Sequence, residues 1–320
     1  MLDQLIPTLS QARGTPVLDQ LIRRKDLTGY LVMFLLSCKV QGLSPDTIRA
    51  YRGLVGYFIR FIEQGGVTHP AQVAPDHIRL FLLKQQETCN SISIRTYYRH
   101  IKRFFNWLVE ERALTVSPMA VIKPPKASKP LIVPFQESSL RRLLFLCDDS
   151  TFLGARNKAI ILVLTDTGLR LKEIAEIQKS VIDFDRETIK VMGKGAKERV
   201  VRIGENTQRA ILRYLLRRDD TLPCLWVTEE RHLLTKWGIE IMIRKLGKRA
   251  EPINVRCSPH MFRHTFATDA LENGAAEWEV QSLLGHETLE MTRRYTNTLR
   301  SQKAIIGHKK LSPVDNLKLE

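Results

Sequence analysis

The sequence lacks long apolar runs. Its longest run, from Tyr30 to Leu36, ends at a serine and is far shorter than the roughly 20 residues that a membrane-spanning helix needs. No secretory leader is expected, because Asp3 and Gln4 stand where a basic stretch followed by an apolar one would be required. These absences argue against a membrane protein and against a secreted one, and we expect a cytoplasmic protein.

Cysteines and acidic residues are also few. The five cysteines, at positions 38, 89, 147, 224 and 257, form no CxxC pair, and their odd number and wide spacing predict reduced thiols. Aspartate and glutamate total 34 against 50 lysines and arginines, which gives a net charge of +16 and a pI near 9.8. Such an excess is typical of proteins that bind a polyanion, most often nucleic acid. A basic face that serves a membrane surface, or solubility alone, stays an alternative.

The length of 320 residues predicts two domains. From about residue 27 to residue 112 the signals are helical. Ser44 before Pro45 marks a helix start, because serine can cap a helix and proline suits its first turn. Apolar residues then recur at helical spacing until the pair Gly65-Gly66 ends the helix. The first domain is therefore predicted to be mainly α-helical.

A predicted helix from about residue 91 to residue 111 carries apolar residues on one face and basic residues off that face. The basic residues are Arg95, Arg99, Lys102 and Arg103. For an isolated helix a solvated surface stripe is the simpler interpretation. In so basic a chain we favour a face that contacts DNA phosphates.

Residues 118–134 contain five prolines, which deny the segment regular structure and favour an extended course. We interpret it as an interdomain linker. Its lysines are candidates for contacts with a DNA backbone, namely Lys123, Lys126 and Lys129.

After the linker, helical patterns give way to short strands and then return. Strands are expected at residues 181–184, 188–192 and 199–203, and the turn from Gly193 to Ala196 reads as a hairpin. From about Asn206 the pattern is mostly helical again. The second domain is therefore predicted to be α+β, mostly helical with a small antiparallel sheet.

The segment from Ser258 to His264 (SPHMFRH) is the most informative for function. Ser258 can cap a helix, which places His260, Arg263 and His264 in its first turns. A helix N-terminus favours phosphate through its free N–H groups, and arginine adds a planar bidentate donor. A phosphate clamp is one interpretation. Zinc binding by the two histidines, without an HExxH glutamate or an obvious third ligand, and a pair of hydrogen-bonded core histidines are the alternatives.

Two further segments carry cations at backbone breaks. Gly168 ends one helix in TGLR, so that Arg170 can point into a cleft while Glu173 orients it from the next turn. A surface ion pair is the alternative there. Lys194 lies at the tip of the glycine-flanked hairpin, where it could reach a DNA groove, although exposed basic turns are common in proteins.

The last segment combines a helix end with a tyrosine. Leu284-Gly285-His286 ends a helix, and Tyr295 follows nine residues later, directly after two arginines. A lone tyrosine carries no signal, but this one lies in a stretch basic enough to meet a phosphate.

Each segment is weak alone, but their order and spacing resemble the tyrosine recombinase (integrase) family, especially its compact Xer-like and transposon or phage integrase members. The resemblance covers about residues 26–300 and rests on the TGLR, GKG, HxxRH and LGH motifs followed by tyrosine. By this resemblance the catalytic residues are Arg170, Lys194, His260, Arg263, His286 and Tyr295, and none of them departs from the family's pattern.

The resemblance also implies a reaction. Tyr295 would attack the scissile phosphorus and form a 3′-phosphotyrosine, with His260 as the candidate base for its proton. The two arginines and His286 would hold the phosphate oxygens, and Lys194 would protonate the departing 5′ oxygen. No metal ion, ATP or other cofactor is expected. Type IB topoisomerase-like relaxation of DNA and a non-catalytic DNA-binding accessory protein remain alternatives.

The expected partners are double-stranded DNA, at the nucleoid, and further copies of the chain, which would form a homo-oligomer on DNA with a tetrameric synapse. The expected organisation is an N-terminal extension (1–25), a helical SAM-like core-binding domain that binds DNA (26–117), the linker (118–134), the catalytic domain (135–298) and a C-terminal tail (299–320). The tail is expected to dock onto a neighbouring protomer, and packing of the tail on its own domain is the alternative.

Overall fold

The computed structural model describes residues 24–127, 133–193, 198–286 and 288–312, together with residues 314 and 317. The chain divides into two compact units, Met1–Pro130 and Leu131–Glu320. Each unit has a hydrophobic core of its own. Within the described ranges, no helix combines the length and the apolar character that a membrane crossing needs.

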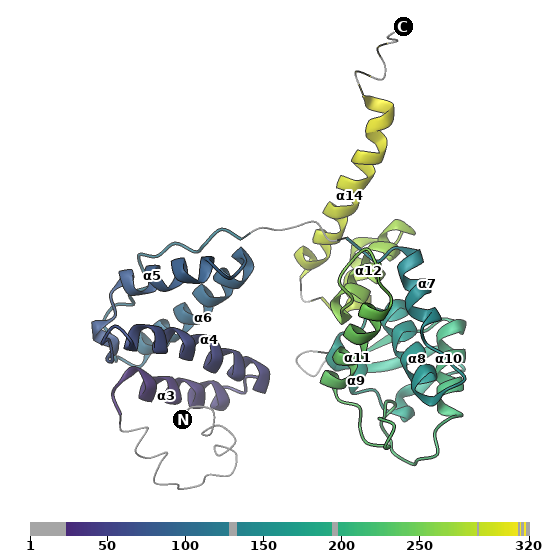
Figure 1. Cartoon of the computed structure of the whole chain (residues 1–320), viewed down its shortest axis with the longest axis horizontal. Coiled ribbons are helices and arrows are strands. Elements are labelled where there is room, and N and C mark those ends of the chain that lie inside the picture. The colour runs from purple at the N-terminus through teal and green to yellow at the C-terminus, as the bar shows by residue number, and fades with distance from the viewer. Residues whose placement is uncertain are drawn as a thin grey trace. The chain divides into compact units, whose positions relative to one another are not determined.

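The first unit consists of helices whose starts are set by local capping (Figure 1). Its main helices are α3 (Leu27–Val40), α4 (Pro45–Glu63), α5 (Pro75–Gln86) and α6 (Ser91–Glu110). The Ser44 side chain accepts a hydrogen bond from the Thr47 backbone nitrogen, and Asn90 accepts one from Ser93. Past the end of α4, Gly66 has a φ of 82°, a conformation that favours glycine. The predicted helix start at Ser44 and the predicted helix over 91–111 are confirmed.

The core of the first unit is rich in aromatic side chains. Phe34 of α3, Phe58 of α4 and Phe104 of α6 are fully buried. The rings of Phe34 and Phe104 meet edge to face with their centroids 5.6 Å apart, an arrangement that aromatic pairs prefer. Burying this face of α6 leaves its basic residues toward solvent, with Arg95, Arg99 and Lys102 exposed.

The proline-rich segment expected to link the domains begins packed against the first unit. Met119 is 1% exposed and belongs to the core of that unit. The Tyr98 hydroxyl donates to the Ile122 carbonyl at 2.8 Å, which ties the chain down as far as that residue. Beyond this contact, Lys123 and Lys126 are exposed. The described residues 123–127 lie beyond these contacts, and at the other end of the segment the Pro134 carbonyl accepts a hydrogen bond from Asn254 Nδ2 at 2.8 Å.

The second unit is mostly helical. Its helices are α7 (Glu137–Phe145), α8 (Phe152–Thr167), α9 (Leu171–Ala175), α10 (Glu205–Leu215), α11 (Lys236–Arg249), α12 (Pro259–Glu272), α13 (Glu277–Leu284) and α14 (Leu289–Leu311). The strands β1 (Ile182–Asp183), β2 (Thr188–Met192) and β3 (Glu198–Arg202) form an antiparallel sheet in that order. In the register of the β2–β3 pair, Ile189 faces Val201 and Met192 faces Glu198. The predicted fold class is confirmed.

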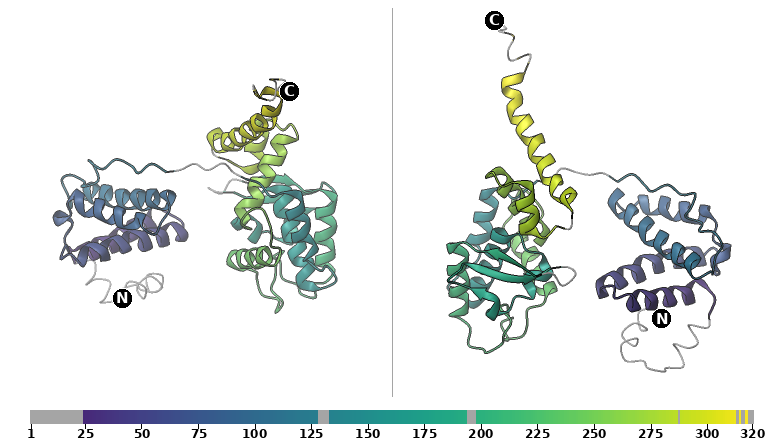
Figure 2. Two further views of the ribbon diagram at one scale, coloured as in Figure 1. Left: turned by 45° about the horizontal axis from the view of Figure 1, so that its top comes forward. Right: turned by 180° about the vertical axis from the view of Figure 1, so that it is seen from behind.

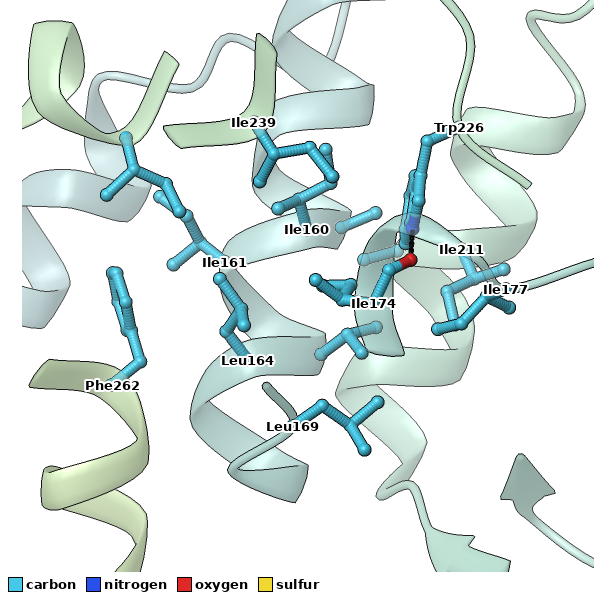
Figure 3. Packing of buried hydrophobic residues seen from close by; sticks show 14 of the residues in the cluster. Ile160, Ile161, Leu164, Leu169, Ile174, Ile177, Ile211, Trp226, Ile239 and Phe262 are labelled. Carbon is cyan, nitrogen blue, oxygen red and sulfur yellow. Dashed lines mark hydrogen bonds between the residues drawn. The ribbon is translucent and has the colours of Figure 1, made fainter. Parts of the chain in front are cut away.

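Helix α8 lies in the middle of this unit and packs against α10 and α12. Figure 3 shows Ile160 and Ile161 of α8 among buried side chains from other elements, including Phe262 of α12. Trp226 is fully buried, and its indole N–H donates to the Ile174 carbonyl at 2.8 Å. This hydrogen bond gives the buried indole N–H a partner, without which its burial would destabilise the fold. It also anchors the short helix α9.

The last helix, α14, packs against α12 and α13 through its N-terminal part. Thr292, Tyr295 and Leu299 are buried there. The C-terminal part of α14 extends away from the rest of its unit (Figures 1 and 2). The helix is continuous across residues 298 and 299, where the boundary between catalytic domain and tail was expected.

Candidate active site

The break between α8 and α9 positions the first arginine of the site. Gly168 ends α8 with a φ of 59°, and a Cβ there would lie 2.7 Å from side-chain atoms of both Leu284 and Phe266. The left-handed backbone and the lack of space both favour glycine. Arg170 then forms the N-cap of α9. Its side chain, 30% exposed, donates from Nη2 to the Gly285 carbonyl at 2.9 Å.

A buried carboxylate holds this arginine. Glu173 is 5% exposed, and it accepts hydrogen bonds from the Arg170 backbone nitrogen at 2.8 Å and from Arg170 Nη1 at 2.9 Å. Arg199 of β3 donates both terminal nitrogens to the same carboxylate at 2.8 Å. Burial raises the pKa of Glu173, but hydrogen bonds from Arg199 and Arg170 outweigh it, and the pKa is lowered overall. The ion pair of Arg170 with Glu173, whose carboxylate is buried, therefore replaces the surface ion pair considered for the TGLR segment.

Arg263, in the first turns of α12, is the most buried cation of the site. It is 4% exposed and donates to the Gly168 carbonyl at 2.8 Å and to the Leu284 carbonyl at 2.7 Å. Burial, followed by repulsion from Arg170, lowers its pKa to about 10, so it stays charged at neutral pH. Ser258 occupies the N-cap of α12 as expected, but its hydroxyl makes no capping hydrogen bond.

His286 directly follows the left-handed Gly285, whose φ is 61°, at the end of α13. It is 8% exposed, and its Nδ1 lies 2.8 Å from the Thr292 hydroxyl. Burial lowers its pKa to about 4, with further contributions from Arg263 and Arg170. The ring is therefore neutral at pH 7, between the turn that contacts Arg170 and the helix that carries the tyrosine.

Tyr295 lies on α14 and is 4% exposed. Its hydroxyl oxygen lies 2.9 Å from Nδ1 of His264. Its ring lies nearly parallel to that of His286, with the centroids 6.2 Å apart and an interplanar angle of 7°. Burial raises the pKa of the phenol, although the nearby charges of Arg263 and Arg294 oppose the shift. The tyrosine is thus a protonated phenol between two histidines.

Contacts from α9, α12, α13 and α14 bring most of the predicted catalytic residues into one place. Arg170 and Arg263 meet the carbonyls around the Gly285 turn, and His286 and Tyr295 lie beside each other. His260 lies one helical turn before His264, with their ring centroids 6.2 Å apart. The sixth predicted residue, Lys194, lies outside the described residues.

The predicted DNA-contact residues belong to another part of the chain. Arg95, Arg99 and Lys102 lie exposed on α6 in the first unit. Arg103 is paired instead with Glu110 of the same helix, with 2.9 Å between Nη1 and Oε1. Lys129 lies outside the described residues.

No group of three or more histidine, cysteine, aspartate or glutamate side chains is arranged to hold a metal ion in the part of the chain that the structure describes. The zinc alternative for His260 and His264 therefore finds no third ligand within that part. His264 has instead the Tyr295 hydroxyl as its partner, at 2.9 Å.

Residues 134–302 match the phage integrase family, and residues 31–117 match a phage integrase N-terminal SAM-like domain. The chain belongs to the phage integrase family. The resemblance expected from the motifs is thereby confirmed.

Curated relatives of this chain are named as tyrosine recombinases. It is 32% identical over 266 residues to the tyrosine recombinase XerC of Anoxybacillus flavithermus, a match that covers 80% of this chain and 88% of the relative. It is 30% identical over 272 residues to the tyrosine recombinase XerD of Listeria monocytogenes, covering 81% and 90%. The predicted enzyme class, tyrosine recombinase, is confirmed.

Solved structures show the same fold. The XerH site-specific recombinase bound to palindromic difH substrate aligns with a TM-score of 0.68 at 18% identity, covering 94% of this chain and 87% of that one. A lambda integrase fragment, solved as a dimer bound to a COC′ core site, aligns with a TM-score of 0.68 at 15% identity, covering 83% and 97%.

Two residues of the site were not in the predicted catalytic set of this integrase. Arg199 lies 26 positions from Glu173 in sequence, in a strand without a motif, and no local signal could have paired the two. His264 was considered only as a zinc ligand or a core histidine. Its spacing of four residues from His260 placed both on one helix face, which left the partner of each undecided.

Proposed function

We propose that this chain is a site-specific DNA recombinase that cuts and rejoins DNA strands through a 3′-phosphotyrosine on Tyr295. One observation carries the proposal. The Tyr295 hydroxyl is buried and bonded to a histidine at 2.9 Å, and the charges of two buried or half-buried arginines, Arg263 and Arg170, act on its pKa. A phenol in that setting is a nucleophile placed beside an anion-binding site.

The arginines would bind the scissile phosphate. Arg170 and Arg263 are held by the Glu173 carboxylate and by backbone carbonyls, so their guanidinium groups are positioned before the substrate arrives. Preorganised donors of this kind stabilise the charge that grows on phosphate oxygens in a pentacoordinate transition state. Neutral His286, next to the tyrosine ring, would add a hydrogen bond to the same phosphate.

The bond changes balance without an external energy source. A bond forms between Tyr295 Oη and phosphorus, and the bond from phosphorus to the 5′ oxygen breaks. The tyrosine loses its proton to a base on α12, and the sequence analysis predicts that this base is His260. The departing 5′ oxygen gains a proton, and the resemblance assigns that step to Lys194. The phosphotyrosine conserves the phosphodiester energy, so we expect neither ATP nor a metal ion or other cofactor to be required.

The first unit would hold the DNA. Its exposed cations on α6, Arg95, Arg99 and Lys102, can neutralise backbone phosphates. The lysines after residue 122 would follow the duplex from one unit to the other. DNA as the partner is supported by solved neighbours of the same fold whose names include a DNA or a recombination-site substrate. Such an enzyme would act at the nucleoid.

Strand exchange needs several active sites, so we propose a homo-oligomer on DNA with a tetrameric synapse. The segment 299–320 would contribute by docking onto a neighbouring protomer. Its first residue, Leu299, is buried against its own unit, whereas Ile305 is 71% exposed. Truncation after Thr298 should preserve binding to a single DNA site and remove cooperative assembly and recombination. Normal recombination by the truncated chain would contradict the docking proposal.

The tyrosine is tested with DNA that the chain itself selects. A duplex is enriched from a random-sequence library by binding to the purified protein, and a nick beside the cleavage point traps the covalent adduct. Tyr295→Phe removes only the hydroxyl, so it should bind the duplex as well as the parent chain and form no adduct on a denaturing gel. Protein-linked DNA formed by the variant would reject Tyr295 as the nucleophile.

The same nicked duplex separates recombination from topoisomerase-like relaxation. A recombinase transfers the cut strand to a second duplex, whereas a relaxing enzyme rejoins it to its original partner. The recombinase names of the curated relatives support transfer. A labelled strand that is never found joined to the second duplex would favour relaxation.

A further inference from the structure

The two histidines of α12 have different positions relative to the nucleophile. His264 faces α14, where its Nδ1 lies 2.9 Å from Tyr295 Oη and the two ring centroids lie 5.5 Å apart. His260 lies one turn before His264 on α12, with the two ring centroids 6.2 Å apart and an interplanar angle of 23°. In the part of the chain that the structure describes, the tyrosine hydroxyl is hydrogen-bonded to His264 and not to His260.

The surroundings of His264 keep it neutral in the free protein. Burial first, and then the charges of His260, Arg294 and Arg263 in that order, lower its pKa to about 4. A neutral imidazole has one ring nitrogen with a proton and one without. With its one ring proton on Nε2, the tautomer that a proton acceptor for Tyr295 requires, the unprotonated Nδ1 can accept the hydrogen bond of the tyrosine hydroxyl.

We infer that His264, rather than His260, takes the proton of Tyr295 during cleavage and returns it during rejoining. This inference rests on the proposed function. As the bond from Oη to phosphorus forms, the phenol proton moves to Nδ1 and His264 becomes a cation. When a 5′-hydroxyl attacks the phosphotyrosine, the bond from phosphorus to Oη breaks, and the departing tyrosine oxygen takes the proton back from Nδ1. The histidine therefore ends each cycle as it began.

DNA itself would switch this base on. Without substrate, Arg263 and Arg294 disfavour a cation at His264, so the tyrosine keeps its proton. A scissile phosphate between the arginines brings negative charge, which raises the proton affinity of a nearby histidine. The base would therefore gain strength only when the phosphate to be attacked is in place.

The experiment compares His264→Asn with His260→Asn in the full chain. The asparagine oxygen lies near the position of histidine Nδ1, so it can accept the tyrosine hydrogen bond but cannot hold the proton. On the selected nicked duplex, single-turnover adduct formation by His264→Asn should fall by a factor of about 10² to 10⁴, the usual contribution of a general base. Binding of the duplex should stay within a few-fold of the parent chain.

A fluorinated tyrosine at position 295 supplies the decisive readout, because its more acidic phenol needs less help from a base. Fluorination should restore most of the rate lost in His264→Asn. If His260→Asn also slows cleavage, fluorination should not restore that loss, because the tyrosine hydroxyl is hydrogen-bonded to His264 and not to His260 in the described residues. A role of His264 limited to holding the ring would leave the fluorinated enzyme as slow as the unfluorinated variant.

Several results would overturn the inference. Adduct formation by His264→Asn within about threefold of the parent rate, or a loss that fluorination leaves unchanged, excludes His264 as the proton acceptor. Restoration in His260→Asn alone transfers the role to His260. If His264→Asn does not fold, nitrogen NMR of the parent chain replaces it, and His264 must carry two ring protons in the adduct and one in the free protein. A parent chain that forms no adduct contradicts the proposed function instead.

Discussion

Glu173→Gln tests whether the buried carboxylate is what holds the arginines. The change keeps the shape of the side chain and removes its charge. The carboxylate accepts four hydrogen bonds, two from Arg170 and two from Arg199. An amide has a single oxygen, so its NH₂ group would be turned toward donors on one side, and both guanidinium charges would lose their counterion.

Removing one partner of a buried ion pair typically costs about 3 to 5 kcal/mol, because the remaining charge stays buried without compensation. Arg199 is 14% exposed and Glu173 4%, so the pair lies in this regime. Arg170, at 30%, is partly hydrated and contributes less. We therefore expect Glu173→Gln to lower the free energy of unfolding of the second unit by about 3 kcal/mol. Cleavage should fall as well, because Arg170 is released from its fixed position.

Urea denaturation measures this loss, and Trp226 is a suitable reporter. Its indole is bonded to Ile174, on the same short helix as Glu173. A Trp107→Phe background confines the emission to the second unit, in which Trp237 and Trp278 are exposed already in the folded state and Trp226 is buried. The matched control is Glu137→Gln, which breaks an exposed i,i+4 pair whose side chains are both 76% exposed and should cost about 0.5 kcal/mol or less.

A loss of less than about 1 kcal/mol in Glu173→Gln, the range of an exposed pair, would contradict this expectation. In that case the charge of Glu173 does not hold the two arginines, and their preorganisation needs another cause.

Three further outcomes are expected. A Cβ at Gly53 of α4 would meet nothing within 4 Å, so Gly53→Ala should raise the free energy of unfolding of the first unit by about 1 kcal/mol. A Cβ at Gly29 would lie 2.2 Å from a backbone oxygen, so Gly29→Ala should lower the melting temperature. Because the pKa values of His264 and His286 are lowered from 6.5 to about 4, the unfolded chain binds more protons between those values. Acidification to pH 5 should therefore reduce the free energy of unfolding, by at most about 2 kcal/mol per histidine, and His286→Asn should show a smaller reduction in urea titrations at pH 7 and pH 5. Lys194→Ala should cleave slowly but recover on DNA with sulfur at the bridging 5′ position, since a thiolate leaves without protonation; equal defects on both substrates in single-turnover assays would exclude a proton-donating role.

Local signals in the sequence were sufficient for α4, α6 and the three strands. Ser44 before Pro45 marked the start of α4, and the β-strands lie within one or two residues of the predicted ranges. Such signals arise from backbone geometry and capping within a few residues, so they do not depend on how the rest of the chain packs. The break at Gly168 was predictable for the same reason, because a left-handed residue ends a helix locally.

Contacts between distant residues required the tertiary structure. The motifs identified a family and a set of residues, but helical spacing put His260 and His264 on one face without deciding which meets Tyr295. The packing of α12 against α14 decides it. The sequence around Arg199 contains no motif that predicts its hydrogen bonds to Glu173. An ion pair between distant residues depends on where separate elements come to lie in the fold. The sequence by itself determined which groups were available for phosphate chemistry, and the packing of the helices determined which of them touch.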